Sequence, residues 1–160
     1  MIRVRAARAE EADALTALCL RSKAHWGYDA EFMRLSGAAL TVTAAMIAQD
    51  RVLVAEDRGG AVLGVAAVEA LHADGKFDLS LLFVEPSAIR TGVGRTLFEA
   101  AVGLVQTRGG RCLSILSDPF AAAFYQHLGA VKIGEAPSDA IPGRWVPLFE
   151  YEIARSPILD

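Results

Sequence analysis

Several features that define familiar protein classes are missing from this 160-residue sequence. It has only two cysteines, Cys19 and Cys112, which lie far apart and without C-x-x-C spacing, so a disulfide framework is excluded. No apolar run approaches the roughly 18 residues of a membrane span. The first residues pass from Arg3 and Arg5 to Glu10 without a signal-peptide core. These absences predict two reduced core thiols in a cytoplasmic protein.

An excess of positive charge is also missing. The chain carries 16 Lys and Arg against 19 Asp and Glu, a net charge of −3 at pH 7. Such a chain has no general attraction to nucleic acid or to an anionic membrane. No Cys, His or Asp cluster has metal-ligand spacing, and no G-x-S-x-G motif occurs. The sequence therefore predicts no metal, no nucleic-acid partner and no membrane partner.

What is present is an ordinary globular composition. Apolar residues make up 53% of the chain and charged residues 22%, which is enough to build a packed core with a solvated surface. No repeat, linker or low-complexity tract divides the chain. We therefore expect a single domain over residues 1–160.

The most informative stretch is an apolar strand over residues 79–84, followed by a glycine-containing loop and a helix. Apolar residues recur every four positions at Val93, Leu97, Ala101 and Val105, the period of a helix with one buried face. The first N–H groups of a helix have no partner within it and attract anions. The stretch therefore predicts an anion site at the start of this helix.

The loop itself strengthens that prediction. Gly92 and Gly94 leave the backbone open to a phosphate, and Arg90 and Arg95 can add charge-assisted hydrogen bonds from either side. A P-loop is excluded because no Lys-Ser or Lys-Thr pair occurs. A dinucleotide-binding fingerprint is disfavoured because Leu97 stands at its third glycine position. Asp118, at the end of the next strand, stands where the ribose-binding acid of that motif would be, so this interpretation is not excluded.

Two blocks resemble motifs of one family. Residues 82–86 (LFVEP) and 90–97 (RTGVGRTL) resemble motif A of the GNAT superfamily of acyl-CoA-dependent N-acyltransferases, with Ile89 at a position that usually carries Gln or Arg. Residues 117–130 resemble motif B, with matches at Ala121, Phe124, Tyr125 and Gly129. Asp118 stands where Asn is usual, and Ala130 where Phe is usual. The resemblance is specific over residues 79–134.

The resemblance implies a binding site for acetyl-CoA as co-substrate. The residues that it assigns to this cofactor are Leu82, Phe83, Val84, Arg90, Thr91, Gly92, Val93, Gly94, Arg95, Thr96 and Asp118. The strand over 82–84 should separate from the strand over 112–116 and hold the pantetheine arm. Asp118 has two readings, since Asp before Pro commonly caps a helix and can also contact the pantetheine amide.

For catalysis, Tyr125 is the predicted general acid, because a phenol is protonated at neutral pH and can donate to a departing thiolate. The alternative is a tyrosine that only fills the core. The general base has three candidates: Glu69, which we favour, Asp78, and a water molecule that relays the proton to Tyr28 or His25. A solvated surface charge is the competing interpretation of each carboxylate.

The acceptor side is the least explicit part of the sequence. His25, Trp26 and Tyr28 form an aromatic cluster that either packs as a local core or lines the acceptor pocket, as the same region does in GNAT enzymes. We expect these three residues and Glu69 to face one cleft. Trp26 or Tyr28 would then offer an aromatic face to a cationic amine.

The pattern of elements, β-α-α-β-β-β-α-β-α-β-β, is that of a GNAT domain. The fold class implied is α/β (α+β), with a mixed, strongly twisted sheet of about six or seven strands flanked by helices on both faces. The implied function is direct acetyl transfer, in a ternary complex, to a small amine or peptide amine. A non-catalytic acyl-CoA sensor is the alternative, and a nicotinamide-dependent oxidoreductase a third. Apolar strands at the C-terminus are compatible with a homodimer.

Overall fold

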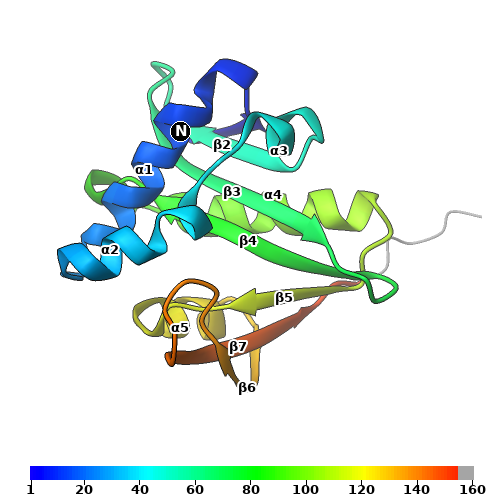
Figure 1. Cartoon of the computed structure of the whole chain (residues 1–160). Coiled ribbons are helices and arrows are strands. Elements are labelled where there is room, and N and C mark those ends of the chain that lie inside the picture. Colours follow the sequence, from blue (N-terminus) through cyan, green and yellow to red (C-terminus); the bar gives the residue numbers. More distant parts are fainter. Residues whose placement is uncertain (155–160) are drawn as a thin grey trace, which may run out of the picture.

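A seven-stranded sheet forms the centre of the molecule, in the strand order β1-β2-β3-β4-β5-β7-β6 (Figure 1). The computed structural model describes residues 1–154. Neighbouring strands are antiparallel except β4 and β5, which are parallel. The strands are β1 (Arg3–Ala6), β2 (Val52–Glu56), β3 (Val62–Ala70), β4 (Lys76–Val84), β5 (Cys112–Leu116), β6 (Val131–Pro137) and β7 (Trp145–Glu152).

Five α-helices and four single 3₁₀ turns connect these strands. The α-helices are α1 (Ala12–Ala24), α2 (Ala30–Ser36), α3 (Ala44–Ala48), α4 (Val93–Thr107) and α5 (Ala122–His127). The 3₁₀ turns are η1 (Ala9–Glu11), η2 (Ala38–Leu40), η3 (Pro86–Ala88) and η4 (Pro119–Ala121). The expected order of elements is confirmed, except that three α-helices instead of two precede β2. Helix α5 is short, because the turn that precedes it, η4, is a 3₁₀ turn.

Helices cover both faces of the sheet, as expected, and each face has its own core. On one face, Leu97, Ala101 and Val105 of α4 are fully buried against Val68 of β3 and Leu113 of β5. The predicted four-residue period of this helix is thereby confirmed. It follows from the 3.6-residue turn, which returns every third or fourth side chain to the same side.

The second core lies between the sheet and α1. Leu15, Leu18 and Cys19 of α1 pack with Val54 and Val65 of the central strands. Burial raises the pKa of the Cys19 thiol to about 12, so this cysteine is the inert core thiol that the sequence predicted.

Cys112 differs from that prediction. Its neighbour Leu113 fills the α4-side core, and because side chains alternate along a strand, Cys112 points to the opposite face. There it is half-buried, with its Sγ 3.5 Å from a carboxylate oxygen of Glu150. Cys112 is therefore not a core thiol.

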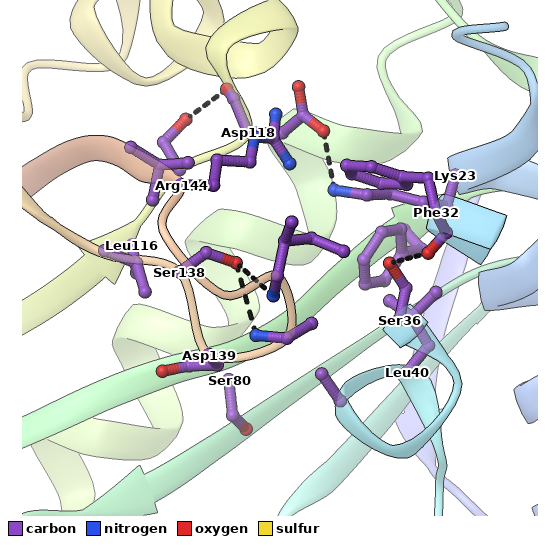
Figure 2. A pocket seen from close by; sticks show the side chains of 16 residues that line it. Lys23, Phe32, Ser36, Leu40, Ser80, Leu116, Asp118, Ser138, Asp139 and Arg144 are labelled. Carbon is purple, nitrogen blue, oxygen red and sulfur yellow. Dashed lines mark hydrogen bonds and ion pairs between the residues drawn. The ribbon is translucent and has the colours of Figure 1, made fainter. Parts of the chain in front are cut away.

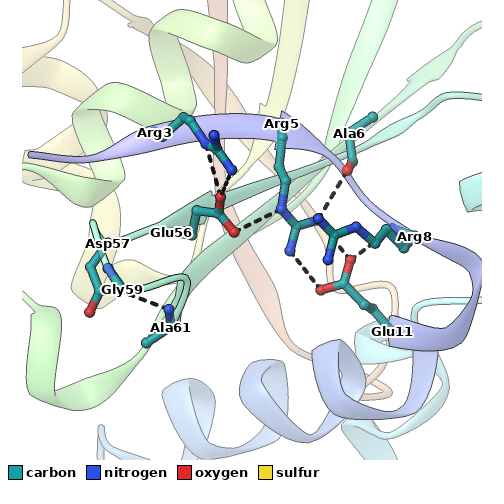
Figure 3. A network of polar contacts seen from close by, with 9 residues as sticks. All are labelled: Arg3, Arg5, Ala6, Arg8, Glu11, Glu56, Asp57, Gly59 and Ala61. Atoms are coloured by element: carbon teal, nitrogen blue, oxygen red, sulfur yellow. Dashed lines mark hydrogen bonds and ion pairs between the residues drawn. The ribbon is translucent and has the colours of Figure 1, made fainter.

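A network of ion pairs attaches the first strand to the sheet (Figure 3). Arg3 and Arg5 both bind the Glu56 carboxylate, and Arg5 also binds Glu11 through two hydrogen bonds of 2.8 and 2.9 Å. The Arg5 hydrogen bond and the Arg8 backbone N–H lower the pKa of Glu11 from 4.5 to about 2. The resulting stabilisation is present above pH 4.5 and is lost as the pH falls towards 2. The arginines near the N-terminus thus hold β1 in place.

No helix in residues 1–154 combines the length and the apolar character needed to cross a membrane. Across the same residues, no group of three or more His, Cys, Asp or Glu side chains is placed to hold a metal ion.

Candidate active site

The sheet opens between β4 and β5, the one parallel pair. These strands pair only at Lys76, Phe77 and Asp78, and the last pair joins Asp78 to Ser114. β5 continues to Leu116 with β7 as its partner. Beyond Asp78, β4 therefore has no ladder partner on its β5 side within the part of the chain that the structure describes. A backbone left in this way needs another hydrogen-bond partner, such as a bound ligand.

A β-bulge lies at the point where the strands part. Val68 of β3 pairs with Leu79, whereas the next residue back, Ala67, pairs with Leu81. The intervening Ser80 is the extra residue, and its hydroxyl donates to the Ala67 carbonyl at 3.2 Å. A bulge bends the strand and reverses which side chains face each side. Accordingly Leu79 lies in the α4-side core and Leu81 in the α1-side core.

A cavity of about 510 Å³ occupies the gap between β4 and β5 and reaches the start of α4. It brings together most of the residues that the sequence assigned to the cofactor and to acid catalysis. These residues are Leu82, Phe83, Val84, Arg90, Gly92, Gly94, Arg95, Asp118 and Tyr125. The cavity thus connects the diverging strands with the predicted anion site.

The start of α4 has the geometry of an anion site. Gly92, with φ of 91°, is the N-cap and offers no capping side chain, and the first turn holds no acidic residue. The first helical hydrogen bond runs from the Thr96 N–H to the Gly92 carbonyl, at 3.1 Å. The N–H groups before Thr96 are therefore available to a ligand. A Cβ on Gly94 would lie 3.2 Å from the Phe124 ring, so glycine keeps this part of the cavity open.

Arg90 is held in an uncommon conformation. Its φ of 67° lies in the left-handed region that L-residues other than Gly, Asn and Asp seldom adopt. Such strain is found preferentially at functional sites. Arg90 lines the cavity beside the α4 start, so this strained residue lies next to the anion site.

Three other predicted loop residues do not present their side chains to the cavity. Val93 is buried in the core, and the hydroxyl groups of Thr91 and Thr96 donate to the carbonyls of Ala88 and Gly92. Any contribution from these residues to ligand binding comes from their backbone.

Tyr125 packs in the core and also lines the cavity. Its ring packs among Phe98, Phe124 and Phe149, and the residue is 7% exposed, yet the side chain also lines the cavity. Burial raises the pKa of Tyr125 well above its usual value, and the carboxylates of Asp118 and Asp78 raise it further. The hydroxyl is therefore a proton donor at any physiological pH.

Asp118 is an N-cap, as the sequence suggested. Its Oδ1 accepts the Phe120 N–H at 2.9 Å, while Oδ2 accepts from Lys23 Nζ at 2.6 Å and from the Tyr28 hydroxyl at 2.8 Å. Burial would raise the pKa of Asp118, but the hydrogen bonds from Lys23 and from the Phe120 N–H outweigh it and lower the pKa. An ionised, fully bonded Asp118 is a poor proton acceptor.

A second, smaller cavity of about 120 Å³ lies on the α2 side of the same gap (Figure 2). Its lining includes α2, the end of β5 and the loop between β6 and β7. The residues common to both cavities are Lys23, Ser80, Phe83, Leu116 and Asp118. The two cavities therefore meet where β4 and β5 part.

The structure does not bring the aromatic residues assigned to the acceptor cleft into one cavity. Trp26 lines the larger cavity and stacks on Phe120, with ring centroids 5.1 Å apart. His25 makes an edge contact with Trp26. Tyr28 stacks on Phe32 at 3.8 Å, and the protein's own Lys23 and Arg144 lie near its ring. The ring of Tyr28 is therefore occupied by the protein's own groups, whereas Trp26 is 38% exposed and lines the larger cavity.

Glu69 also lies apart from both cavities. Its side chain is 55% exposed and faces Arg51 at 3.8 Å. Its cross-strand neighbour Asp78 is half-buried, and because Phe77 and Leu79 point into the α4-side core, Asp78 points to the opposite face. Burial, with smaller contributions from Asp139 and Glu69, raises the pKa of Asp78 to about 6. Of the two carboxylates, Asp78 has the surroundings of a proton acceptor.

The sequence contained no signal for two other residues of the site. Lys23 is in the last turn of α1, where a lysine ordinarily interacts favourably with the helix dipole. Arg144 is in the β6–β7 loop, and its guanidinium donates to the Tyr28 hydroxyl at 2.9 Å. Both residues find their partners far along the chain, so no local spacing identifies them.

A twisted mixed sheet, opened beside a glycine-rich helix start, is the architecture of the N-acetyltransferases. Residues 29–148, three quarters of the chain, match the family model described as the acetyltransferase (GNAT) domain. The chain belongs to the GNAT acetyltransferase family. None of the curated proteins matches its sequence.

Solved structures share the fold. A GCN5-related N-acetyltransferase from Rhodopseudomonas palustris is 23% identical, with 94% of each chain covered and a TM-score of 0.74. The PaiA N-acetyltransferase from Thermoplasma acidophilum, solved with coenzyme A, is 15% identical over 95% of this chain and 99% of its own, with a TM-score of 0.77. A putative acetyltransferase from Salmonella typhimurium, solved with acetyl-CoA, is 20% identical over 100% and 98%, with a TM-score of 0.69.

Proposed function

We propose that this protein transfers an acetyl group from acetyl-CoA to a primary amine, directly and within a ternary complex. The observation that carries the proposal is the meeting of two cavities at the opening between β4 and β5. A thioester in the larger cavity and an amine in the smaller one would approach each other there. Solved relatives that contain coenzyme A or acetyl-CoA support the choice of cofactor.

The cofactor's pyrophosphate would bind at the start of α4. The N–H groups of Val93, Gly94 and Arg95 precede the first helical hydrogen bond, and Arg90 and Arg95 carry positive charge beside them. The pantetheine arm would then run along residues 82–84, where the main-chain groups that face β5 lack a strand partner among the described residues. One of these N–H groups would stabilise the negative charge that develops on the thioester oxygen.

In the reaction, the amine nitrogen attacks the thioester carbonyl carbon, a C–N bond forms, and the C–S bond then breaks. The amine must first lose its proton. We assign the acceptance of that proton to Asp78 in place of Glu69, because Asp78 is half-buried and has a raised pKa. Asp78 is two residues before Ser80, which lines both cavities, so the proton would pass through a water molecule.

The departing sulfur receives its stabilisation from Tyr125. Free thiols have a pKa near ~8.5, below that of this buried phenol, so complete proton transfer to a free thiolate is unfavourable. A hydrogen bond from the hydroxyl to the sulfur still stabilises the charge that grows as the C–S bond breaks.

A thiol-release assay with acetyl-CoA and pooled primary amines tests the proposal directly. We expect release of free CoA that depends on the amine, together with a saturable rise in melting temperature on adding acetyl-CoA. Thermal stabilisation without amine-dependent release under any pool would instead support a non-catalytic acyl-CoA sensor. Absence of both would contradict the proposal.

The phosphate site can be tested by the substitution Gly94→Glu. A carboxylate at this position would repel the pyrophosphate, and its side chain would fill the space in front of Phe124. We expect acetyl-CoA to give no thermal stabilisation of this variant, where the wild type shows a saturable increase.

The control for this prediction is Gly103→Glu, in the middle of the same helix, where an added Cβ meets nothing within 4 Å. That variant should bind acetyl-CoA as the wild type does. Equal stabilisation of Gly94→Glu and wild type would place the cofactor elsewhere on the protein.

A further inference from the structure

Arg144 is the unusual charge of the smaller cavity. Its side chain is half-buried and its guanidinium lies 4.8 Å from the centre of the Phe32 ring and 5.3 Å from that of Tyr28. The Tyr28 hydroxyl accepts one of its N–H groups. Within residues 1–154, no carboxylate lies at ion-pair distance from Arg144. The aromatic rings therefore fix a guanidinium whose remaining donors can serve a ligand.

The carboxylate that shares the Tyr28 hydroxyl with Arg144 already has its own partners. The carboxylate of Asp118 binds Lys23, the Tyr28 hydroxyl and a backbone N–H. Lys23 and Asp118 thus neutralise each other, which leaves one positive charge at this end of the cavity. A ligand group with a single negative charge, a carboxylate, matches this balance better than a doubly charged phosphate.

The opposite end of the cavity has the opposite charge. Figure 2 shows Arg144, Asp118 and Lys23 towards one end, and Ser80 and Asp139 towards the other. Asp139 and Ser80 line this end of the cavity, and Asp78 is two residues before Ser80 on β4. An ammonium group would be attracted to this end, next to the residue that we assign as the base. The cavity is therefore complementary to a small zwitterion.

We infer that the acetyl acceptor is a small amino acid, whose carboxylate binds Arg144 and whose amine is directed towards Ser80 and Asp78. This inference rests on the proposed function and names the substrate class of the same site. It replaces the recognition of a cationic amine by Tyr28, because the ring of Tyr28 already contacts the Arg144 guanidinium.

The test compares three matched amines: an amino acid, its primary carboxamide and its decarboxylated amine, over a panel of α- and ω-amino acids. We expect the wild type to show a kcat/KM about 10–100-fold higher for the best acid than for its two analogues, the usual effect of a charge-assisted hydrogen-bond pair. Arg144→Gln should remove this preference through a higher KM for the acid, with the KM for acetyl-CoA unchanged. Arg144→Lys should retain part of it.

Arg34→Gln is the matched control, because Arg34 is on the exposed side of α2 and binds Glu31. It should leave all constants unchanged. Equal use of the acid and its analogues by the wild type, or an equal loss for all three in Arg144→Gln, would overturn the inference while leaving acetyl transfer intact. If no amine is acetylated, the proposed function fails. Calorimetric titration of the acid and of the carboxamide into the wild type and into Arg144→Gln then tests the carboxylate site by itself.

Discussion

The substitution Asp78→Asn is expected to lower kcat by about 10²–10⁴-fold, the usual range for the loss of a general base. The wild-type rate should rise with pH through the pKa of Asp78, about 6, as the carboxylate becomes ionised. In the asparagine variant this step should disappear and leave only the titration of the amine itself. A pH–rate profile over pH 5–9 with saturating substrates measures both effects.

The same substitution should stabilise the protein. A variant that is slower but more stable has lost the base and not the fold of the site. A native pKa raised from 3.8 to about 6 means that stability is complete below pH 4 and declines as the pH rises to 6. Asparagine avoids that decline, so the free energy of unfolding above pH 7 should rise by up to ~2–3 kcal/mol. This magnitude follows from ~1.4 kcal/mol for each pKa unit, reduced by the partial exposure of the side chain to water. Glu69→Gln is the control, because its exposed side chain should leave rate and stability almost unchanged. A rate loss in Glu69→Gln but not in Asp78→Asn would return the base to Glu69.

Tyr125→Phe is expected to lower kcat by about 10²-fold, at the lower end of the range for acid catalysis. The effect is placed there because the raised pKa of Tyr125 favours a hydrogen bond to sulfur over complete proton transfer. The ring contacts with Phe98, Phe124 and Phe149 persist in the variant, so the melting temperature and the affinity for acetyl-CoA should hold.

Single-turnover kinetics with a slow, weakly basic amine make the chemical step rate-limiting and provide the measurement. Tyr151→Phe offers a matched control, because Tyr151 also packs on Phe98 but lines neither cavity. The variant Tyr125→Phe reacting at the wild-type rate under these conditions would reduce Tyr125 to its packing role.

Much of the cofactor side could be predicted from the sequence because its signals are local. The four-residue period of α4 and the glycines at its start are encoded within about fifteen residues, and so is the cap that Asp118 forms on the next helix turn. In each case the residues that interact are neighbours in the chain. Their geometry therefore follows from helix and turn rules without knowledge of the rest of the fold.

The acceptor side was decided by tertiary structure. No local pattern predicts the bulge at Ser80. Asp78, rather than Glu69, lies beside the opening because it belongs to the last pair between β4 and β5. Trp26 stacks on Phe120, and Lys23 and Arg144 are joined through Asp118 and Tyr28. These residues come from three distant segments, 23–28, 118–120 and 144. Strand register and long-range packing determine which of these side chains meet, and no spacing along the chain records that. The sequence alone thus determined the fold family and the predicted phosphate loop. Only the folded sheet determined which charges line the proposed acceptor cavity, because contacts between strands and loops far apart in the chain bring those charges together.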